Sequence, residues 1–294
     1  MTACSLDLSD GVRFLVRRHG KPEAPRILIG HGTGFAVDGF RRMWEPLCDT
    51  FDVFVYDLRH HGSNDPCPPE SITAERQNDD LREILSGLRE NFGEKPVFGL
   101  FHSISGLAAL RVESLAPRLF AGLVLMEPPV PPPAGHPLAE AFDQARRMLA
   151  ERTVRRQARF TSLAELAGKY RDRPAFALFE DGAAEMLAAA IAREDADGWT
   201  LRCPPEAESR YYATNHDDGL MDRLDRIACP VLLLAGRGDL AHPGTPAQIA
   251  VQLARLGGFD LLELANATHM MPLERPRTIA EATRAFVRNI TGSV

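Results

Sequence analysis

The sequence lacks most features that would connect it to oxidising compartments, membranes or nucleic acids. Its five cysteines are scattered without a CxxC pair, and this odd, unpatterned set indicates reduced thiols in a cytoplasmic protein. No apolar run is long enough to span a membrane, and the first ten residues have neither the basic start nor the apolar core of a signal peptide. The net charge of −6 argues against a nucleic-acid partner, because phosphate binding needs a basic surface.

Motifs for common cofactors are missing as well. The chain contains no G-x-x-x-x-G-K-[ST] loop, no dinucleotide fingerprint, no HExxH and no Cys/His cluster with metal-ligand spacing. We therefore expect no cofactor and no metal. The expected partner is a small-molecule substrate, with no membrane partner; association into a homodimer stays open.

What the sequence does contain is an alternation of short apolar runs with helix-like segments. Helices are predicted at 71–92, 104–114, 246–256 and 276–290, and a hairpin at 5–20 turns at Ser9-Asp10-Gly11. The runs lack clean polar alternation, which is typical of strands covered on both faces. This pattern predicts an α/β fold with a doubly wound, mostly parallel sheet. Its strands are predicted at 26–30, 51–57, 96–101, 121–127, 230–236 and 259–264.

One region interrupts this alternation. Residues 138–221 contain no convincing strand and several segments with helical propensity and spacing, after a stiff proline cluster. We expect residues 133–222 to form a helical cap, inserted between the two core parts 1–132 and 223–294. Such an insertion would lie over the carboxyl edge of the strands, where open α/β sheets bind ligands.

The stretch FHSISG, residues 101–106, places a serine between a predicted strand and a predicted helix. A serine at such a junction lies on a sharp corner with its hydroxyl above the sheet. Ser103 is therefore a candidate nucleophile, although a serine that caps the following helix is the alternative. Asp239 and His269 each follow a later predicted strand, and Glu127 ends an earlier one.

Together with HGTGF at 31–35 and YDLRHHGSN at 56–64, these motifs occur in an order that resembles the α/β-hydrolase superfamily. The resemblance covers about residues 26–130 and 228–290. It implies an α/β-hydrolase fold with a serine nucleophile at the strand-to-helix corner, which is called the nucleophile elbow. The dehalogenase and epoxide hydrolase branches have aspartate at this position, so Ser103 argues against them.

The resemblance also implies roles for individual residues. Ser103 would be the nucleophile, His269 the general base and Asp239 the acid that orients the histidine. The backbone amides of Thr33 and Ile104 would form the oxyanion hole.

Glu127 is an alternative acid, because some members of the superfamily have it at this strand end. The sequence favours Asp239 over Glu127.

Three positions depart from the superfamily pattern. Phe101 stands where the elbow usually has glycine, and it fits only if its ring finds room in a neighbouring layer. His60 and Asn64 replace a usual glycine and serine. We expect His60 to face solvent, and the alternative is that it lines the pocket. His102 is next to the nucleophile in sequence, and we expect it to have a structural role and not a catalytic one.

A basic stretch, RRMLAERTVRRQARF at 146–160, lies in the predicted cap. It is predicted to be a solvated helix face, because charged helix faces are usually exposed. The alternative is that it faces an anionic substrate.

The sequence as a whole predicts a hydrolase that cleaves a small or medium apolar carboxylic ester through a Ser-His-Asp triad and an acyl-enzyme. The same triad would also serve a C–C bond hydrolase, a lactonase or a perhydrolase. An alternative of another class is a ligand-binding protein on a hydrolase scaffold with vestigial catalysis.

Overall fold

The computed structural model describes residues 2–237 and 245–292. Eight strands form one sheet in the order β1-β2-β4-β3-β5-β6-β10-β11. β2 runs antiparallel to both β1 and β4, and every other neighbouring pair is parallel. The predicted hairpin and the mostly parallel sheet are both confirmed. The strands are β1 Thr2–Asp7, β2 Arg13–Gly20, β3 Arg26–Gly30, β4 Asp52–Tyr56, β5 Val97–His102, β6 Gly122–Met126, β10 Val231–Arg237 and β11 Asp260–Ala265.

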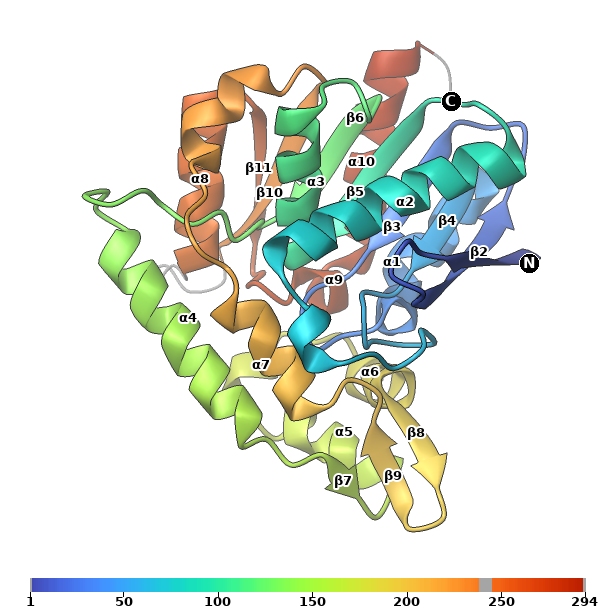
Figure 1. Ribbon diagram of the computed structural model, residues 1–294, viewed down its shortest axis with the longest axis vertical. Helices are drawn as coiled ribbons and strands as arrows, with labels where there is room; N and C mark the ends of the chain where they lie inside the picture. The colour runs from blue at the N-terminus through green and yellow to red at the C-terminus, as the bar shows by residue number, and fades with distance from the viewer. Residues whose placement is uncertain (1, 238–244, 293–294) are drawn as a thin grey trace.

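Helices cover both faces of this sheet (Figure 1). One face carries α2 (Ala74–Phe92), α3 (Ile104–Leu115) and α8 (Thr245–Gly257), whose buried side chains share one core cluster. The other face carries α1 (Arg41–Trp44), α9 (Met271–Glu274) and α10 (Pro276–Thr291), which belong to a second cluster. The sheet is the middle of three layers, as a doubly wound fold requires.

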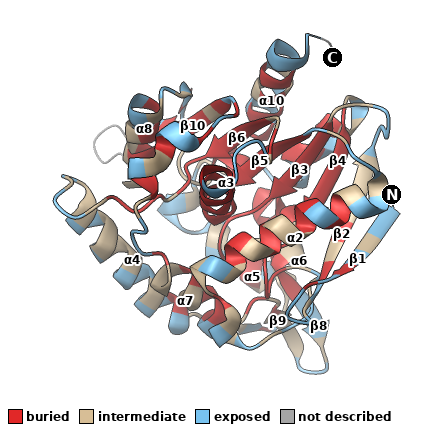
Figure 2. Ribbon diagram, turned by 45° about the horizontal axis from the view of Figure 1, so that its top comes forward, coloured by how far each residue is buried: buried red, intermediate tan, exposed pale blue. Residues whose placement is uncertain are grey.

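Successive residues of the central strands alternate between these two clusters. In β3, Leu28 packs into the first cluster, while Ile27 and Ile29 pack into the second. In β6, Leu125 and Met126 divide in the same way. Since neighbouring side chains of a strand point to opposite faces, both faces must be apolar, and the strands appear as buried ribbons in Figure 2.

Between β6 and β10 the chain leaves the sheet and forms a mostly helical segment, which we call the inter-strand segment (139–213). It contains the expected helices and also an unexpected three-stranded sheet, in the order β7-β9-β8. The prediction of no strand here is wrong, because strands of two to four residues are too short to show a period of two. The elements are α4 Ala139–Val154, β7 Arg159–Phe160, α5 Leu163–Arg171, α6 Ala183–Ile191, β8 Ala192–Asp195, β9 Gly198–Leu201 and α7 Pro205–Ala213.

The inter-strand segment is attached to loops that follow the carboxyl ends of two sheet strands. The hydroxyl of Tyr211 donates a 2.9 Å hydrogen bond to the carbonyl of Arg59, after β4. Asn215, just past α7, donates from Nδ2 to the carbonyl of Pro129, after β6, at 3.0 Å. The segment therefore lies beyond the sheet edge at which the predicted site residues are found. Within the described ranges, no helix is long and apolar enough to cross a membrane.

Candidate active site

Ser103 lies on a sharp corner between β5 and α3. Its backbone has φ 56° and ψ −122°, a conformation that L-residues rarely adopt. Its amide donates a 2.9 Å hydrogen bond to the carbonyl of Met126, the last residue of the neighbouring strand β6. This hydrogen bond connects the corner to the sheet, and the strained backbone conformation of the corner falls on the serine itself.

Phe101 fits below this corner because the strand itself provides room. A Cβ on Gly99 would collide with Cε2 of Phe101, so the ring covers the bare face of that glycine. The ring also makes edge contacts with Tyr56 and Phe120, at centroid distances of 6.5 and 5.7 Å. Because Gly99 has no side chain, the strand has space for the phenylalanine ring at position 101, where the superfamily usually has glycine.

His269 lies in the loop between β11 and α9 and reaches both Ser103 and a carboxylate. Its Nε2 is 3.1 Å from Oγ of Ser103, and its Nδ1 is 2.7 Å from Oε2 of Glu127. The consistent proton arrangement has Nδ1–H donating to the carboxylate and Nε2 accepting from the hydroxyl. These contacts form a continuous hydrogen-bonded chain from Glu127 to Ser103.

Glu127 follows β6 and is only 1% exposed. Its other carboxylate oxygen accepts a 2.7 Å hydrogen bond from the amide of Gly236 in β10. Its φ of 44° is positive, as at Ser103, so both ends of the hydrogen-bonded chain occupy rare backbone conformations. The preferred acid, Asp239, lies outside the described residues; within them, Glu127 is the carboxylate bonded to His269.

The HGTGF loop packs directly against the corner. A Cβ on Gly32 would come within 3.0 Å of Cβ of Ser103, so only glycine allows this approach. The next amide, that of Thr33, and the amide of Ile104 have no acceptor among residues 2–237 and 245–292. Two backbone N–H groups are therefore free near the serine: that of Ile104, which follows Ser103, and that of Thr33, which follows Gly32.

The loop after β4 holds the HGTGF loop in place. Nε2 of His61 accepts a 3.0 Å hydrogen bond from the amide of Gly34, and Oδ1 of Asp57 accepts one of 2.8 Å from the amide of Val37. Burial lowers the pKa of His61 to about 3, so its ring stays neutral and remains an acceptor. Two side chains of the loop after β4 thus hold the backbone of the HGTGF loop and of the residues that follow it.

The prediction that His60 faces solvent is wrong. The residue is only 5% exposed, and burial lowers its pKa. Its φ of 64° explains why a glycine is usual at this position, since the turn needs a left-handed residue. Asn64 connects the same loop to β2, where its Oδ1 accepts from the amide of Leu15 at 2.9 Å.

His102 is fully buried and links the corner to the histidine loop. Its Nε2 donates a 2.8 Å hydrogen bond to the carbonyl oxygen of His269, and the two rings lie 4.8 Å apart. Burial holds the pKa of His102 well below its usual value, so the ring stays neutral. It positions the backbone of His269, a contact that the sequence did not indicate.

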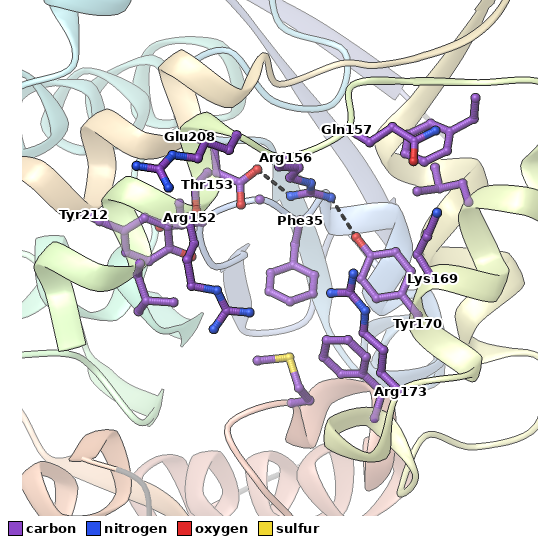
Figure 3. A pocket seen from close by; sticks show the side chains of 18 residues that line it. Phe35, Arg152, Thr153, Arg156, Gln157, Lys169, Tyr170, Arg173, Glu208 and Tyr212 are labelled. Carbon is purple, nitrogen blue, oxygen red and sulfur yellow. Dashed lines mark hydrogen bonds and ion pairs between the residues drawn. The ribbon is translucent and has the colours of Figure 1, made fainter.

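A pocket of about 500 Å³ adjoins these residues. Thr33 and Phe35 from the HGTGF loop and Met270, next to His269, line it. Figure 3 shows the side chain of Phe35 among the labelled side chains around this pocket. The remaining walls come from the inter-strand segment, which includes Arg156 and Tyr170. This volume is in the range of small-molecule sites. Among the described residues, no group of three or more His, Cys, Asp or Glu side chains could hold a metal ion.

Comparisons with known proteins agree with this fold. A model of the "Alpha/beta hydrolase family" matches residues 27–282. Polyketide synthase ThaQ of Burkholderia thailandensis is 26% identical over 98% of this chain, which spans only 13% of that protein's length. The uncharacterized hydrolase YugF of Bacillus subtilis is 23% identical over 95% of this chain and 96% of its own. The crystal structure of E-2-(acetamidomethylene)succinate hydrolase has a TM-score of 0.80 and 18% identity, with 97% of this chain and 98% of that chain covered.

Proposed function

Because this chain belongs to the Alpha/beta hydrolase family and is a hydrolase, we propose that it cleaves a carboxylic ester, or a related carbonyl compound, with Ser103 as nucleophile. The observation that supports this most strongly is the continuous hydrogen-bonded chain from Glu127 through His269 to Ser103. A nucleophile, a base and an orienting carboxylate within hydrogen-bond reach are the arrangement that nucleophilic catalysis needs.

The proposed reaction has two halves. His269 removes the hydroxyl proton as Ser103 attacks the substrate carbonyl, and the same proton then protonates the leaving alcohol or thiol. Water enters, His269 takes its proton, and the resulting hydroxide attacks the acyl-enzyme. The acid product leaves, and the proton returns to Oγ of Ser103.

The proposed oxyanion hole consists of the amides of Thr33 and Ile104. Each tetrahedral intermediate carries a negative oxygen, and a preorganised donor at such a site stabilises it by about 3 kcal/mol. The free state of both amides supports the assignment, since neither would have to give up another acceptor.

Glu127 is the proposed acid of the triad, in place of the Asp239 that the sequence favoured. Its carboxylate is buried, bonded to His269 on one oxygen and to the amide of Gly236 on the other. A carboxylate held in this way fixes the imidazole tautomer and stabilises the imidazolium that forms during the reaction.

Residues 133–222 are the proposed cap over the site, between core parts 1–132 and 223–294. The support is that residues of the inter-strand segment form the far walls of the pocket. The bond cleaved depends on what that pocket admits, so C–C, lactone and perhydrolysis reactions are alternatives that use the same residues.

Two assays test the proposal. We expect turnover of 4-nitrophenyl acetate or butyrate and labelling by a fluorophosphonate probe. Ser103→Ala should lower kcat/KM by about a thousandfold or more and abolish labelling. Ser105→Ala is the matched control, because that hydroxyl donates to the carbonyl of His102 and should not be the labelled group.

Undiminished turnover in Ser103→Ala would refute the nucleophile. Folded wild-type protein that neither labels nor turns over any ester in a broad panel would support a ligand-binding protein with vestigial catalysis.

A further inference from the structure

The pocket beside the proposed nucleophile is strongly cationic. Five of its lining side chains are positively charged, and Glu208 is the one carboxylate among those that line it. We propose that this pocket binds a substrate with an anionic group, a carboxylate or a phosphate, attached to an apolar body; this inference rests on the proposed hydrolase function. The cations are Arg152, Arg155, Arg156, Lys169 and Arg173.

The single carboxylate is already occupied by one of these cations. Glu208 is 5% exposed and forms an ion pair with Nη1 of Arg156, whose Nη2 donates to the hydroxyl of Tyr170 at 2.9 Å. Glu208 also lies against the HGTGF loop, since a Cβ on Gly34 would collide with its Oε1. This pair is therefore a structural link between the inter-strand segment and the loop that contains Thr33.

The other four cations have no carboxylate within 4.0 Å in the described part of the chain. This sets them apart from their neighbours in sequence, since Arg146 and Arg147 both pair with Asp143, and Arg171 pairs with Glu185. Arg146, Arg147 and Arg171 are thus each paired with a carboxylate, while these four pocket-lining cations are not. All four are exposed to solvent, which leaves their charges available to a bound anion.

The two alternatives given for the basic stretch at 146–160, a solvated face and a face toward an anionic substrate, do not exclude each other. Arg152 and Arg155 are exposed to solvent and also line the pocket, together with Arg156, whereas Arg146 and Arg147 pair with Asp143. A helix of 3.6 residues per turn places Arg152, five and six residues after Arg147 and Arg146, on a different face of α4, and Arg155 and Arg156 lie beyond the end of that helix.

Two of the unpaired arginines face each other across the space. Figure 3 shows Arg152, at the end of α4, and Arg173, just after α5, extending from opposite sides, with Phe35 between them. A guanidinium binds a carboxylate or a phosphate through two parallel hydrogen bonds, which suits an anion held between two arginines. An anion placed there would also remove the repulsion between the two positive charges.

The remaining walls indicate the nature of the rest of the substrate. Phe35, Leu149, Phe160, Leu166 and Phe176 line the same pocket and offer apolar surface. Thr33, which also lines it, contributes one of the two free amides beside Ser103. An amphipathic substrate would thus have its carbonyl at Ser103, its hydrocarbon portion along the aromatic rings and its anionic group at the arginines.

Matched substrate pairs test the inference. Mono-(4-nitrophenyl) glutarate and 4-nitrophenyl valerate differ by a carboxylate in place of a methyl group on the acyl side. Butyryl-CoA and butyryl-N-acetylcysteamine share the acyl group and the thioester, and CoA adds phosphates, a pantoyl unit and adenosine to the leaving group. We expect kcat/KM to be at least about tenfold higher for the anionic member of one pair, and this preference to fall about tenfold in Arg152→Gln/Arg173→Gln.

The control is Arg147→Gln/Arg171→Gln, which removes the same charge from α4 and α5 but outside the pocket, and its preference should equal that of the wild type. A preference in the glutarate pair assigns the anion to the acyl portion, and a preference in the CoA pair assigns it to the leaving group. Equal kcat/KM within both pairs overturns the inference while leaving the hydrolase function intact.

Binding is measured separately from turnover. Calorimetric titration of Ser103→Ala with both 4-nitrophenyl esters should give a Kd at least about tenfold lower for the glutarate, and this difference should shrink when Arg152→Gln/Arg173→Gln is added. Equal affinities would overturn the inference even if both esters are cleaved by the wild type. Preferential binding without turnover in the wild type would instead uphold the anion site and refute the proposed function.

Discussion

At the scale of single residues, the proposed acid of the triad is the assignment with the clearest rival. Glu127 and Asp239 both follow sheet strands, so sequence order alone cannot separate them. The difference arises from three-dimensional detail: Glu127 follows β6, whose last residue Met126 pairs with His102. Its long side chain then spans to His269, a reach that depends on a φ of 44° no sequence pattern reports.

We predict that Glu127→Gln lowers kcat by about a thousandfold to ten-thousandfold, because an amide can donate to Nδ1 and favour the wrong tautomer. Asp239→Asn should retain most of the wild-type rate. Steady-state kinetics with 4-nitrophenyl butyrate measures both variants, and circular dichroism checks their folding. The opposite order of the two effects would return the acid role to Asp239.

The other departures from the superfamily pattern are also explained one residue at a time. From the sequence, Phe101 is expected to crowd the nucleophile elbow. The structure avoids this crowding because Gly99, two positions earlier on the same face of the strand, has no side chain. His60 was expected to face solvent, but it is buried. Its burial follows from tertiary packing, which local sequence does not encode.

At the scale of elements, the packing of the Phe101 ring against Gly99 in β5 predicts that substitutions at these two positions have coupled effects on stability. Gly99→Ala should destabilise the protein by about 1–3 kcal/mol, since the new methyl group collides with the ring of Phe101 and with Leu123. Phe101→Ala alone should cost about 3–5 kcal/mol through the cavity it leaves. In the double variant the added methyl group has space, so the cost of Gly99→Ala should be smaller than in the wild type.

Urea unfolding of the wild type, both single variants and the double variant gives the four free energies. If Gly99→Ala costs as much in the Phe101→Ala background as in the wild type, the ring does not depend on the bare face of the glycine. The part of the cost that comes from Leu123 should persist in both backgrounds.

Elements with a strong repeating pattern were the ones that the sequence could predict. The strand 26–30 matches its prediction at both ends, and the predicted helix 276–290 differs from α10 by one residue. The small sheet escaped prediction because β8 directly continues the alanine-rich helix α6. Its four residues, ARED, contain no β-branched or aromatic side chain to indicate a strand.

At the scale of the whole molecule, the site is formed where two parts of the chain meet, and this limits what sequence can say about substrate. The loop that contains Thr33 precedes Arg152 and Arg173 by more than a hundred positions, and no periodicity in the sequence relates the loop to these cations. The charges of the basic stretch were visible from the start. Which of them face the pocket depends on how α4 and α5 are oriented over the sheet.

The buried histidines give the molecule a pH dependence of stability with a definite sign. Four of the described histidines are buried, and burial lowers the pKa of three of them: His60, His61 and His102. In the unfolded chain each would titrate near pH 6.5, so below that pH the unfolded state binds more protons than the folded state. Stability should therefore fall as the pH drops below about 6.5, by up to about 1.4 kcal/mol per pH unit for each such histidine.

Three carboxyl groups act in the opposite direction, because burial raises the pKa of Asp80, Glu208 and Glu274. A single-residue comparison separates the two effects. His60→Asn keeps a residue that tolerates a φ of 64° and removes one buried imidazole, while all other titrating groups stay in place.

We expect the free energy of unfolding of His60→Asn to change less steeply than that of the wild type between about pH 6.5 and pH 5. Urea titrations at several pH values measure both slopes. His216→Asn is the control, since that ring is already exposed and its loss should leave the wild-type slope unchanged. If His60→Asn and the wild type have the same slope, the imidazole of His60 takes up its proton as readily when folded as when unfolded, and the burial of this loop has no electrostatic cost.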